Sequence, residues 1–242
     1  REYPTFFNER SPRLILSYKY HGALGDKDRQ VTDDALAAIP SGGDLFLLLG
    51  DLDTLAHTRG AGEPFERYLT EIDRLLEQLA TAFRKQHGES ARVVVLSDHG
   101  MAKVDAAGAV RVNLAKQFGP VRYDRYVPFL DALMLRLWGE DDALLGEMSA
   151  WLNGLGVGRV LTPDERARYG VRNPGFGKVL FLLDEGRAFF PSWFGAKFPL
   201  AMHGYDPALE SQQAFFGCLG PASHPLPRRS MEIFPFLKTL GG

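Results

Sequence analysis

The sequence predicts an α/β domain in which helices flank a largely parallel central sheet. Short apolar runs bounded by Gly, Asp or Pro recur along the chain, as in strands that are buried on both faces. Amphipathic segments with helical spacing lie between these runs, and this alternation is typical of layered domains with parallel strands. The 242 residues, 45% of them hydrophobic, are enough to build such a core.

Six apolar runs are the candidate strands, and five amphipathic segments are the candidate helices. The strands are expected at residues 14–18, 45–49, 93–96, 133–138, 179–183 and 214–219. The helices are expected at residues 33–39, 64–86, 141–152, 163–169 and 231–240. The second helix is the clearest, because apolar residues recur in it every three or four positions, Pro64 suits its first turn and Gly88 its end.

We expect one catalytic-type domain over residues 1–242. The Pro- and Gly-rich stretches at 173–177 and 221–227 are interpreted as loops within it, since apolar patterning resumes on both sides. Aromatic-rich loops interrupt the simple alternation of strands and helices between residues 122 and 190. This region could form an insertion or cap within the domain.

Composition and charge exclude several functional classes. Lys and Arg total 28 and Asp and Glu total 30, so the formal charge of −2 provides no global field to attract a nucleic-acid polymer or an anionic membrane. No apolar run approaches the ~20 residues of a transmembrane segment, and the polar start at residues 1–4 lacks a signal-peptide core. Because Cys218 is the only cysteine, the chain cannot form an internal disulfide. We interpret this residue as a small buried hydrophobe.

Three clusters of acids and histidines carry the candidate chemistry. They are Asp-Thr-Leu-Ala-His at 53–57, Ser-Asp-His-Gly-Met at 97–101 and His-Gly-Tyr-Asp at 203–206. The first two directly follow candidate strands, and ligands of open α/β sheets bind at the carboxyl ends of the strands. Carboxylates and imidazoles are ligands that zinc prefers, so their convergence from distant segments predicts a two-metal hydrolytic site.

The spacing of Asp53 and His57 places both side chains on one side of a helical turn, where one metal could bind both. Spacing alone leaves an ordinary turn or helix-capping role for Asp53 equally open. For Asp51 and Asp206 that structural role is the preferred interpretation. The remaining histidines are interpreted as solvated or hydrogen-bonded loop residues: His21, His87 and His224.

The other two clusters are weaker when each is taken alone. Asp98 and His99 are adjacent and would diverge on an extended backbone, but a tight turn relaxed by Gly100 could bring both to one metal, or to one metal each. Gly204 after His203 would let the backbone pass close to a metal or a phosphate.

Taken together and in order, these clusters resemble the alkaline phosphatase superfamily, and most closely its type I phosphodiesterase/nucleotide pyrophosphatase branch. Residues 53–57 are similar to the family's Asp-x-x-x-His element, 97–101 to its Ser-Asp-His-Gly-Met and 203–206 to its His-Gly-Tyr-Asp. The resemblance covers most of the chain and implies an alkaline-phosphatase-like layered fold. Ala56 and Arg59-Gly60 depart from the family's usual Gly and Gly-Pro, and these departures concern loop shape.

The resemblance implies two zinc ions per complete site, although other divalent metals would also suit such ligands. By this resemblance, Asp53, His57 and His203 bind one zinc ion, while Asp98 and His99 contribute to the second. Three protein ligands with an open fourth position are the pattern of a catalytic zinc, so the first set is complete.

The family's nucleophile is not identified in this chain. Family members carry an Asp and a Thr or Ser nucleophile at a helix start, upstream of the Asp-x-x-x-His element. The available hydroxyls before residue 53 are Thr5, Ser11, Ser17, Thr32 and Ser41. Thr32 is interpreted as an ordinary N-cap. We therefore expect the chain to lack the amino-terminal strand and nucleophile helix and to be inactive alone, although a naturally short member would show the same pattern.

The implied function is metal-dependent hydrolysis of phosphodiesters or related phosphate esters by two-zinc phosphoryl transfer through a phospho-enzyme in the complete protein. The partner would be a small-molecule phosphate ester, and the resemblance allows a periplasmic or extracellular location. The alternatives are a non-catalytic zinc-binding domain of the same fold and a related phosphomutase, whereas the sulfatase motif Cys-x-Pro-x-Arg does not occur. Aromatic residues at 123–129, 189–191 and 193–194 could wall a pocket for a base or lipid, or serve only in packing.

Overall fold

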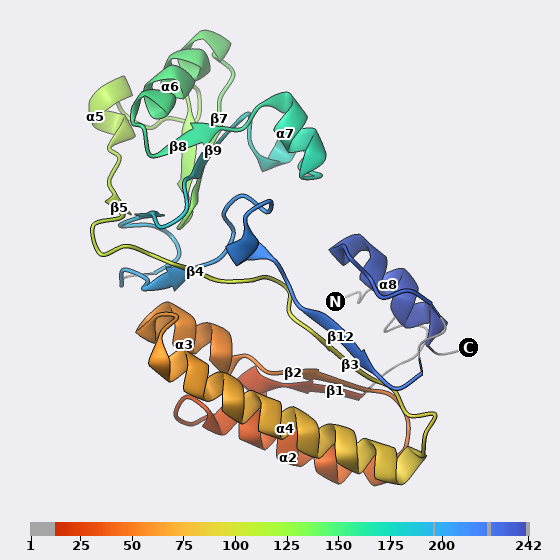
Figure 1. Cartoon of the computed structure of the whole chain (residues 1–242). Helices are drawn as coiled ribbons and strands as arrows, with labels where there is room; N and C mark the ends of the chain where they lie inside the picture. Colours follow the sequence, from red (N-terminus) through yellow and green to blue (C-terminus); the bar gives the residue numbers. More distant parts are fainter. Residues whose placement is uncertain (1–12, 196, 222–223, 241–242) are drawn as a thin grey trace. The chain divides into compact units, whose positions relative to one another are not determined.

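The computed structural model describes residues 13–195, 197–221 and 224–240 and confirms the predicted α/β class. The chain forms two compact units, of which the second spans residues 100–213 and the first comprises the segments on either side of it (Figure 1). The chain thus leaves the first unit after His99 and returns to it at Ala214. The single catalytic-type domain expected above, with an insertion or cap over 122–190, stays a prediction.

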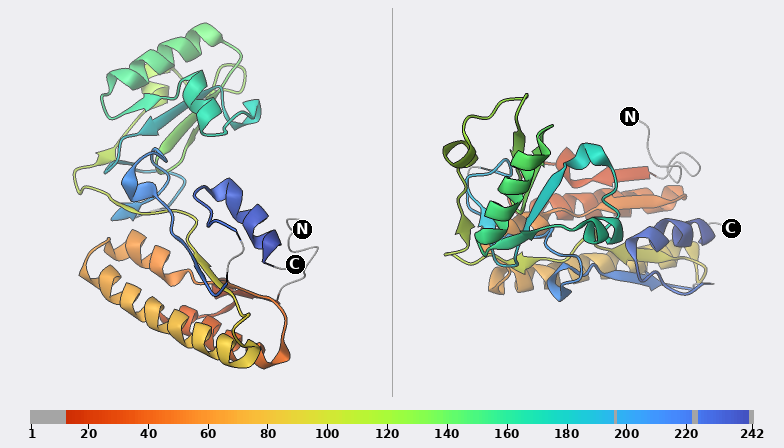
Figure 2. Two further views of the ribbon diagram at one scale, coloured as in Figure 1. Left: turned by 45° about the vertical axis from the view of Figure 1, so that its right-hand side comes forward. Right: turned by 90° about the horizontal axis from the view of Figure 1, so that it is seen from above.

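The first unit contains the parallel strand pairing that the sequence predicts. Strands β1 (Arg13–Leu16) and β2 (Leu45–Leu48) pair in parallel, and helix α2 (Asp26–Ala38) lies in the crossover that such a connection requires. Helix α4 (Glu63–His87) runs beside α2 in the views of Figures 1 and 2. Apolar residues of the strands and both helices share one buried cluster: Ile15, Val31, Ala35 and Leu79.

Helix α2 begins well before the expected residue 33. It starts at Asp26, directly after Gly25. Because its first turns are polar, the spacing of apolar residues does not predict them. The N-cap interpretation of Thr32 is wrong, because Thr32 lies inside the helix, is 1% exposed and donates its hydroxyl proton to the Asp28 carbonyl at 2.9 Å.

The first unit also contains an antiparallel pair, β3 (Val93–Leu96) with β12 (Phe216–Leu219), in which Leu96 lies opposite Phe216. Helix α8 (Ser230–Thr239) packs on β12, where the Phe216 and Phe236 rings meet edge to face at 5.4 Å. Cys218 on β12 is half-buried, and burial raises the pKa of its thiol. A raised pKa keeps the thiol protonated and unreactive, consistent with the structural interpretation.

The second unit is built on a four-stranded antiparallel sheet with the order β6 (Val127–Leu130), β7 (Met134–Trp138), β9 (Val179–Leu183), β8 (Gly158–Val160). It departs from the parallel expectation because β6 and β7 are joined by a short turn, which only antiparallel strands allow. Helix α6 (Asp142–Gly154) contributes Met148 and Leu152 to the largest core cluster, where they join Leu135 and Phe181 of the sheet.

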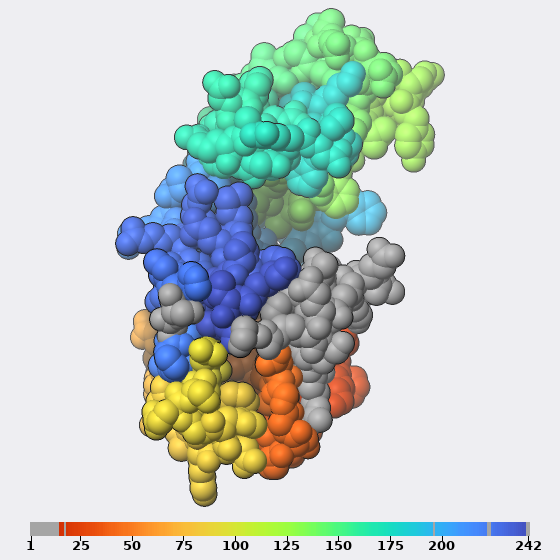
Figure 3. Space-filling view, turned by 90° about the vertical axis from the view of Figure 1, so that its right-hand side faces the viewer, coloured from red at the N-terminus to blue at the C-terminus, as the bar shows by residue number. Residues whose placement is uncertain are grey.

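The remaining elements of the second unit are short. Helix α7 (Pro163–Arg168) begins with a capping box between Thr162 and Glu165, has no buried residue, and appears in teal on the surface in Figure 3. The other elements are β4 (Ala102–Lys103), β5 (Ala109–Val110), α5 (Leu114–Phe118), β10 (Ala188–Phe189) and β11 (Ala201–Met202). The short 3-10 helices of the chain are Ser17–Lys19, Ile39–Ser41, Pro174–Phe176 and Glu210–Gln212.

Across the described ranges, we find no helix that combines the length and the apolar character needed to cross a membrane.

Candidate metal centre

Asp53 and His57 lie on α3 (Asp51–Arg59), the helix that follows β2. Their spacing of four residues puts them one turn apart, so that Nε2 of His57 lies 3.3 Å from Oδ1 of Asp53. The His57 side chain is only 11% exposed, whereas the Asp53 carboxylate is partly open to solvent. The two predicted ligands on α3 therefore converge as their spacing indicates.

Asp98 and His99 follow β3, and Nε2 of His99 lies 3.4 Å from Oδ1 of Asp98. The Asp98 side chain is 87% exposed, so it is accessible to a ligand or an ion. Gly100 is required here by a close approach of backbone, since a Cβ at this position would lie 2.2 Å from the Ser211 carbonyl oxygen. Its φ is not in the left-handed region, so the tight turn relaxed by glycine that we expected does not explain it.

His203 follows β11 in the second unit, and the loop after it is fixed by one side-chain amide. The Oε1 atom of Gln212 accepts hydrogen bonds from the Gly204 N–H at 2.7 Å and from the Tyr205 N–H at 3.1 Å. Gly204 has φ +99°, and a Cβ there would meet only a Leu133 methyl group within 4 Å. This glycine therefore serves the backbone conformation, and the close approach to a metal or a phosphate stays a prediction.

Asp206 has the structural role that the sequence favours. Its carboxylate accepts hydrogen bonds from Arg159 Nη2 at 2.6 Å and from the Tyr169 hydroxyl at 2.8 Å. Burial raises the pKa of Asp206, but hydrogen bonds from the Ala208 N–H, Tyr169 and Arg159 outweigh it and hold the pKa below its usual value. Asp206 thereby ties the His-Gly-Tyr-Asp segment to β8 and to the end of α7.

Asp51 also has a structural role, and it shares that role with a residue that the sequence did not single out. Asp51 and Asp28 are both fully buried, and each accepts hydrogen bonds from the backbone near the other. Nothing in the pattern around Asp28 distinguishes it from the neighbouring acids of α2. The only local signal is that Gly25 and Gly50, which precede α2 and α3, have no side chain with which to cap a helix.

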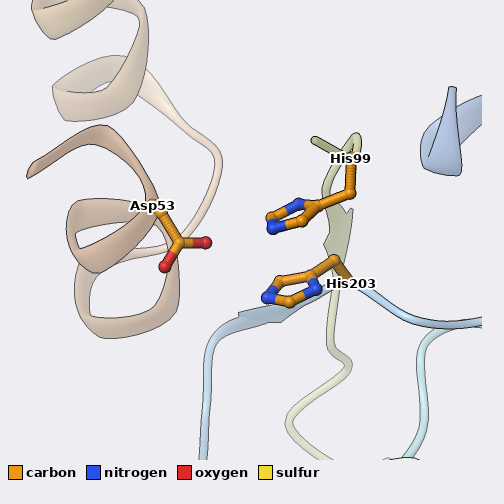
Figure 4. A group of neighbouring side chains, drawn as sticks. All are labelled: Asp53, His99 and His203. Carbon is orange, nitrogen blue, oxygen red and sulfur yellow. The ribbon is translucent and has the colours of Figure 1, made fainter. Parts of the chain in front are cut away.

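Three of the predicted ligands come together. One ligand atom from each of Asp53, His99 and His203 lies within 4.8 Å of the others, as drawn in Figure 4. A carboxylate oxygen with two imidazole nitrogens is a donor set that suits zinc. The resemblance assigned His99 to a different ion from Asp53 and His203. Since ions of two-metal sites lie about 3.5–4 Å apart, ligands of both can approach one another this closely, and the assignment to each ion stays a prediction.

Two of the hydroxyls considered as nucleophiles, those of Thr32 and Ser41, can be placed with their surroundings. Thr32 is buried within α2 and engaged with the helix backbone, and Ser41 is exposed at the end of a 3-10 helix. Thr5 and Ser11 lie outside the described residues, and Ser17 lies in the first 3-10 helix.

The aromatic residues considered as pocket walls divide into core and surface. Phe189 is 1% exposed and belongs to the main core of the second unit, so its role is packing. Trp193 is 76% exposed and stacks on Phe129 with ring centroids 6.1 Å apart. Tyr123 is almost fully exposed. A pocket of about 310 Å³ in the first unit is lined by other residues, among them Leu24, Arg29 and Tyr68.

The fold is that of known phosphodiesterases. The chain is similar to human ectonucleotide pyrophosphatase/phosphodiesterase 5 (20% identity) and to its murine counterpart (17% identity), each with a TM-score of 0.63. The murine protein has also been solved as an inactive form in complex with AMP. Each match covers 84% of this chain and 55% of the other, so the chain spans about half the length of these proteins. At these identities the likeness shows the fold alone.

The family follows from the sequence match. No curated protein sequence matches the chain significantly. The family model described as type I phosphodiesterase/nucleotide pyrophosphatase matches residues 13–140, which is more than half of the chain and includes the first two acid-histidine clusters. His203 lies beyond the matched residues. The chain belongs to the type I phosphodiesterase/nucleotide pyrophosphatase family.

Proposed function

We propose that this chain provides the metal-binding residues of a hydrolase that cleaves phosphodiesters or related phosphate esters by two-zinc phosphoryl transfer. The observation that carries the proposal is the grouping of Asp53, His99 and His203, because their ligand atoms lie within 4.8 Å of one another. Family membership supports the same reaction class.

Two zinc ions are the proposed cofactors. Asp53, His57 and His203 would hold one ion, and Asp98 and His99 would contribute to the other. When bound, the ions supply Lewis-acid stabilisation of the phosphoryl oxygens and activation of a hydroxyl or water.

The chain's own residues hold these ligands in place. Nε2 of His57 lies 3.3 Å from Oδ1 of Asp53 on the same helix, so these two proposed ligands already face one another. The Gln212 amide fixes the backbone next to His203, and such support of a ligand typically contributes to metal affinity.

The proposed substrate is a small-molecule phosphate ester, and nucleotides are the first class to test. This choice rests on the murine relative, which was solved with AMP. We also propose an extracellular or periplasmic location, which the description of the relatives as ectonucleotide enzymes supports.

One observation favours a second function: among the described residues before Asp53, no hydroxyl is identified as a nucleophile. Under this alternative, the chain binds zinc but does not catalyse hydrolysis by itself. A phosphomutase of the same superfamily is the enzymatic alternative, and products of a phosphodiester assay distinguish it from a hydrolase.

Zinc binding by the 242-residue chain tests the metal centre. After dialysis against micromolar zinc, metal analysis should show bound zinc in the wild type and a loss of at least about tenfold in affinity in His203→Ala. The matched control is His21→Ala, since His21 is an exposed histidine outside the clusters, and its zinc content should equal that of the wild type. Equal zinc content in wild type and His203→Ala would refute the metal centre.

Hydrolysis is tested separately in the natural full-length protein with bis-p-nitrophenyl phosphate as substrate. Zinc-dependent release of p-nitrophenol is expected, and it should be abolished in Asp53→Ala. Zinc-loaded protein without any turnover would contradict the hydrolase and favour the non-catalytic zinc-binding domain.

A further inference from the structure

Helices α2 and α3 both begin after a glycine that cannot cap them with a side chain. Gly25 precedes α2, and Gly50 precedes α3. The first-turn N–H groups of a helix have no partner within the helix, and leaving such groups buried and unpaired is costly. Each of these helix starts therefore needs an acceptor from elsewhere in the chain.

The two helices supply these acceptors to each other. The Asp28 carboxylate of α2 accepts hydrogen bonds from the N–H groups of Gly50 at 2.9 Å and Asp51 at 3.2 Å. In return, the Asp51 carboxylate of α3 accepts from the N–H groups of Gly25 at 2.9 Å and Asp28 at 3.3 Å. Negative charge at a helix N-terminus also interacts favourably with the helix dipole. Each of the two helices thus supplies the cap that defines the start of the other.

Two further side chains complete this reciprocal cap. The Tyr68 hydroxyl of α4 donates to Asp28 Oδ2 at 2.8 Å, and Lys27 Nζ lies 2.9 Å from Asp51 Oδ1. Burial, together with the hydrogen bond to Asp28, raises the pKa of Tyr68, so its hydroxyl stays protonated and remains a donor. Because both carboxylates are fully buried, water cannot replace any of these donors without rearrangement.

The reciprocal cap lies directly beside the candidate metal ligands. Asp53 is two residues beyond Asp51 on α3, and His57 is one turn further along the same short helix. A shift at the start of α3 therefore moves both side chains. We propose that Asp28, held by Tyr68, is a positioning residue of the metal centre that sets the place of Asp53 and His57. This inference rests on the proposed function.

Zinc affinity of the full chain tests the inference with a matched pair of variants. Tyr68→Phe removes one hydroxyl from the reciprocal cap. Tyr20→Phe removes an equivalent tyrosine–aspartate hydrogen bond, because the Tyr20 hydroxyl donates to Asp34, another carboxylate of α2 that does not cap α3. We expect zinc binding to weaken about tenfold in Tyr68→Phe and about tenfold to a hundredfold in Asp28→Asn, but less than about twofold in Tyr20→Phe. Circular dichroism verifies that each variant is folded.

Cobalt substitution and hydrogen exchange separate positioning from stability. The visible spectrum of bound Co²⁺ should change in Tyr68→Phe and not in Tyr20→Phe, since it reports ligand geometry. Wild-type zinc affinity and an unchanged cobalt spectrum in Tyr68→Phe would overturn the inference while leaving the metal centre intact. A wild type that binds no zinc would overturn the proposed function. In that case hydrogen exchange tests the inference separately, because unchanged amide exchange along α3 in metal-free Tyr68→Phe would exclude a positioning role.

Discussion

Gly100 lies where two backbone segments of the second unit pass too close for any side chain. The substitution Gly100→Ala therefore tests this close approach. An added Cβ would lie 2.2 Å from the Ser211 carbonyl oxygen and 2.8 Å from that of Gln213. Both neighbours are backbone atoms, which cannot rotate away as a flexible side chain would. The segment around Ser211 must therefore move by about 1 Å, which is typical of overpacked sites.

The expected cost follows from this displacement. Overpacking costs about 1–3 kcal/mol, and the shift weakens the 3.3 Å hydrogen bond from the Gly100 N–H to the Gln212 carbonyl, which contributes about 1 kcal/mol. We expect Gly100→Ala to lower the free energy of unfolding by about 2–4 kcal/mol.

Urea denaturation followed by circular dichroism measures this change. The matched control is Gly146→Ala on α6, where an added Cβ meets nothing within 4 Å, and the better helix propensity of alanine should raise stability by up to about 1 kcal/mol. A loss of less than about 0.5 kcal/mol in Gly100→Ala would refute the close approach of the two segments.

Two further predictions concern the segment after His203. Gly204→Ala should cost about 1–2 kcal/mol in urea denaturation because φ +99° is unfavourable for any residue with a Cβ, and an unchanged midpoint would contradict that conformation. Asp206→Asn should destabilise the protein at neutral pH but hardly at all in acid. The lowered pKa of Asp206 means that its contribution to stability is present above the unfolded-state pKa of about 3.9 and is lost as pH falls through the folded-state pKa. Melting temperatures between pH 3 and 7 measure this, and a difference from wild type that is independent of pH would contradict it.

The sequence predicted the relation between Asp53 and His57 more accurately than the role of Gly100. Local patterns are sufficient to place Asp53 and His57 one turn apart, since helix spacing alone determines that relation. For Gly100 the sequence suggested a relaxed turn, whereas the structure shows a close approach to the backbone of Ser211. For Gly204 the structure shows a positive φ, and the predicted approach to a metal or a phosphate stays a prediction. A glycine marks a demand on the backbone, but its nature depends on distant segments such as the one around Ser211.

The reciprocal cap could not be predicted for the same reason. Asp28 is one of several acids at the start of α2, and its burial depends on contacts with Gly50 and Tyr68, which are 22 and 40 residues away. The helix predicted at residues 33–39 is shorter than α2 itself. Its buried residues Val31 and Ala35 form only a narrow apolar stripe, and its first turn consists of polar residues that the cap buries or orders. Long-range hydrogen bonds, and not local propensity, decide where this helix begins.

The pairing of β3 with β12 also constrains the order in which the protein can fold during synthesis. The partner of Leu96 is Phe216, so β3 emerges from the ribosome long before its partner exists. Residues 100–213, which lie between them, already contain the four-stranded sheet and the main core cluster and can become compact first. Pairings between residues so far apart in sequence form slowly, and an unpaired strand edge is prone to association with other chains. During translation, the edge of β3 that pairs with β12 therefore stays open until residues 216–219 have been synthesised.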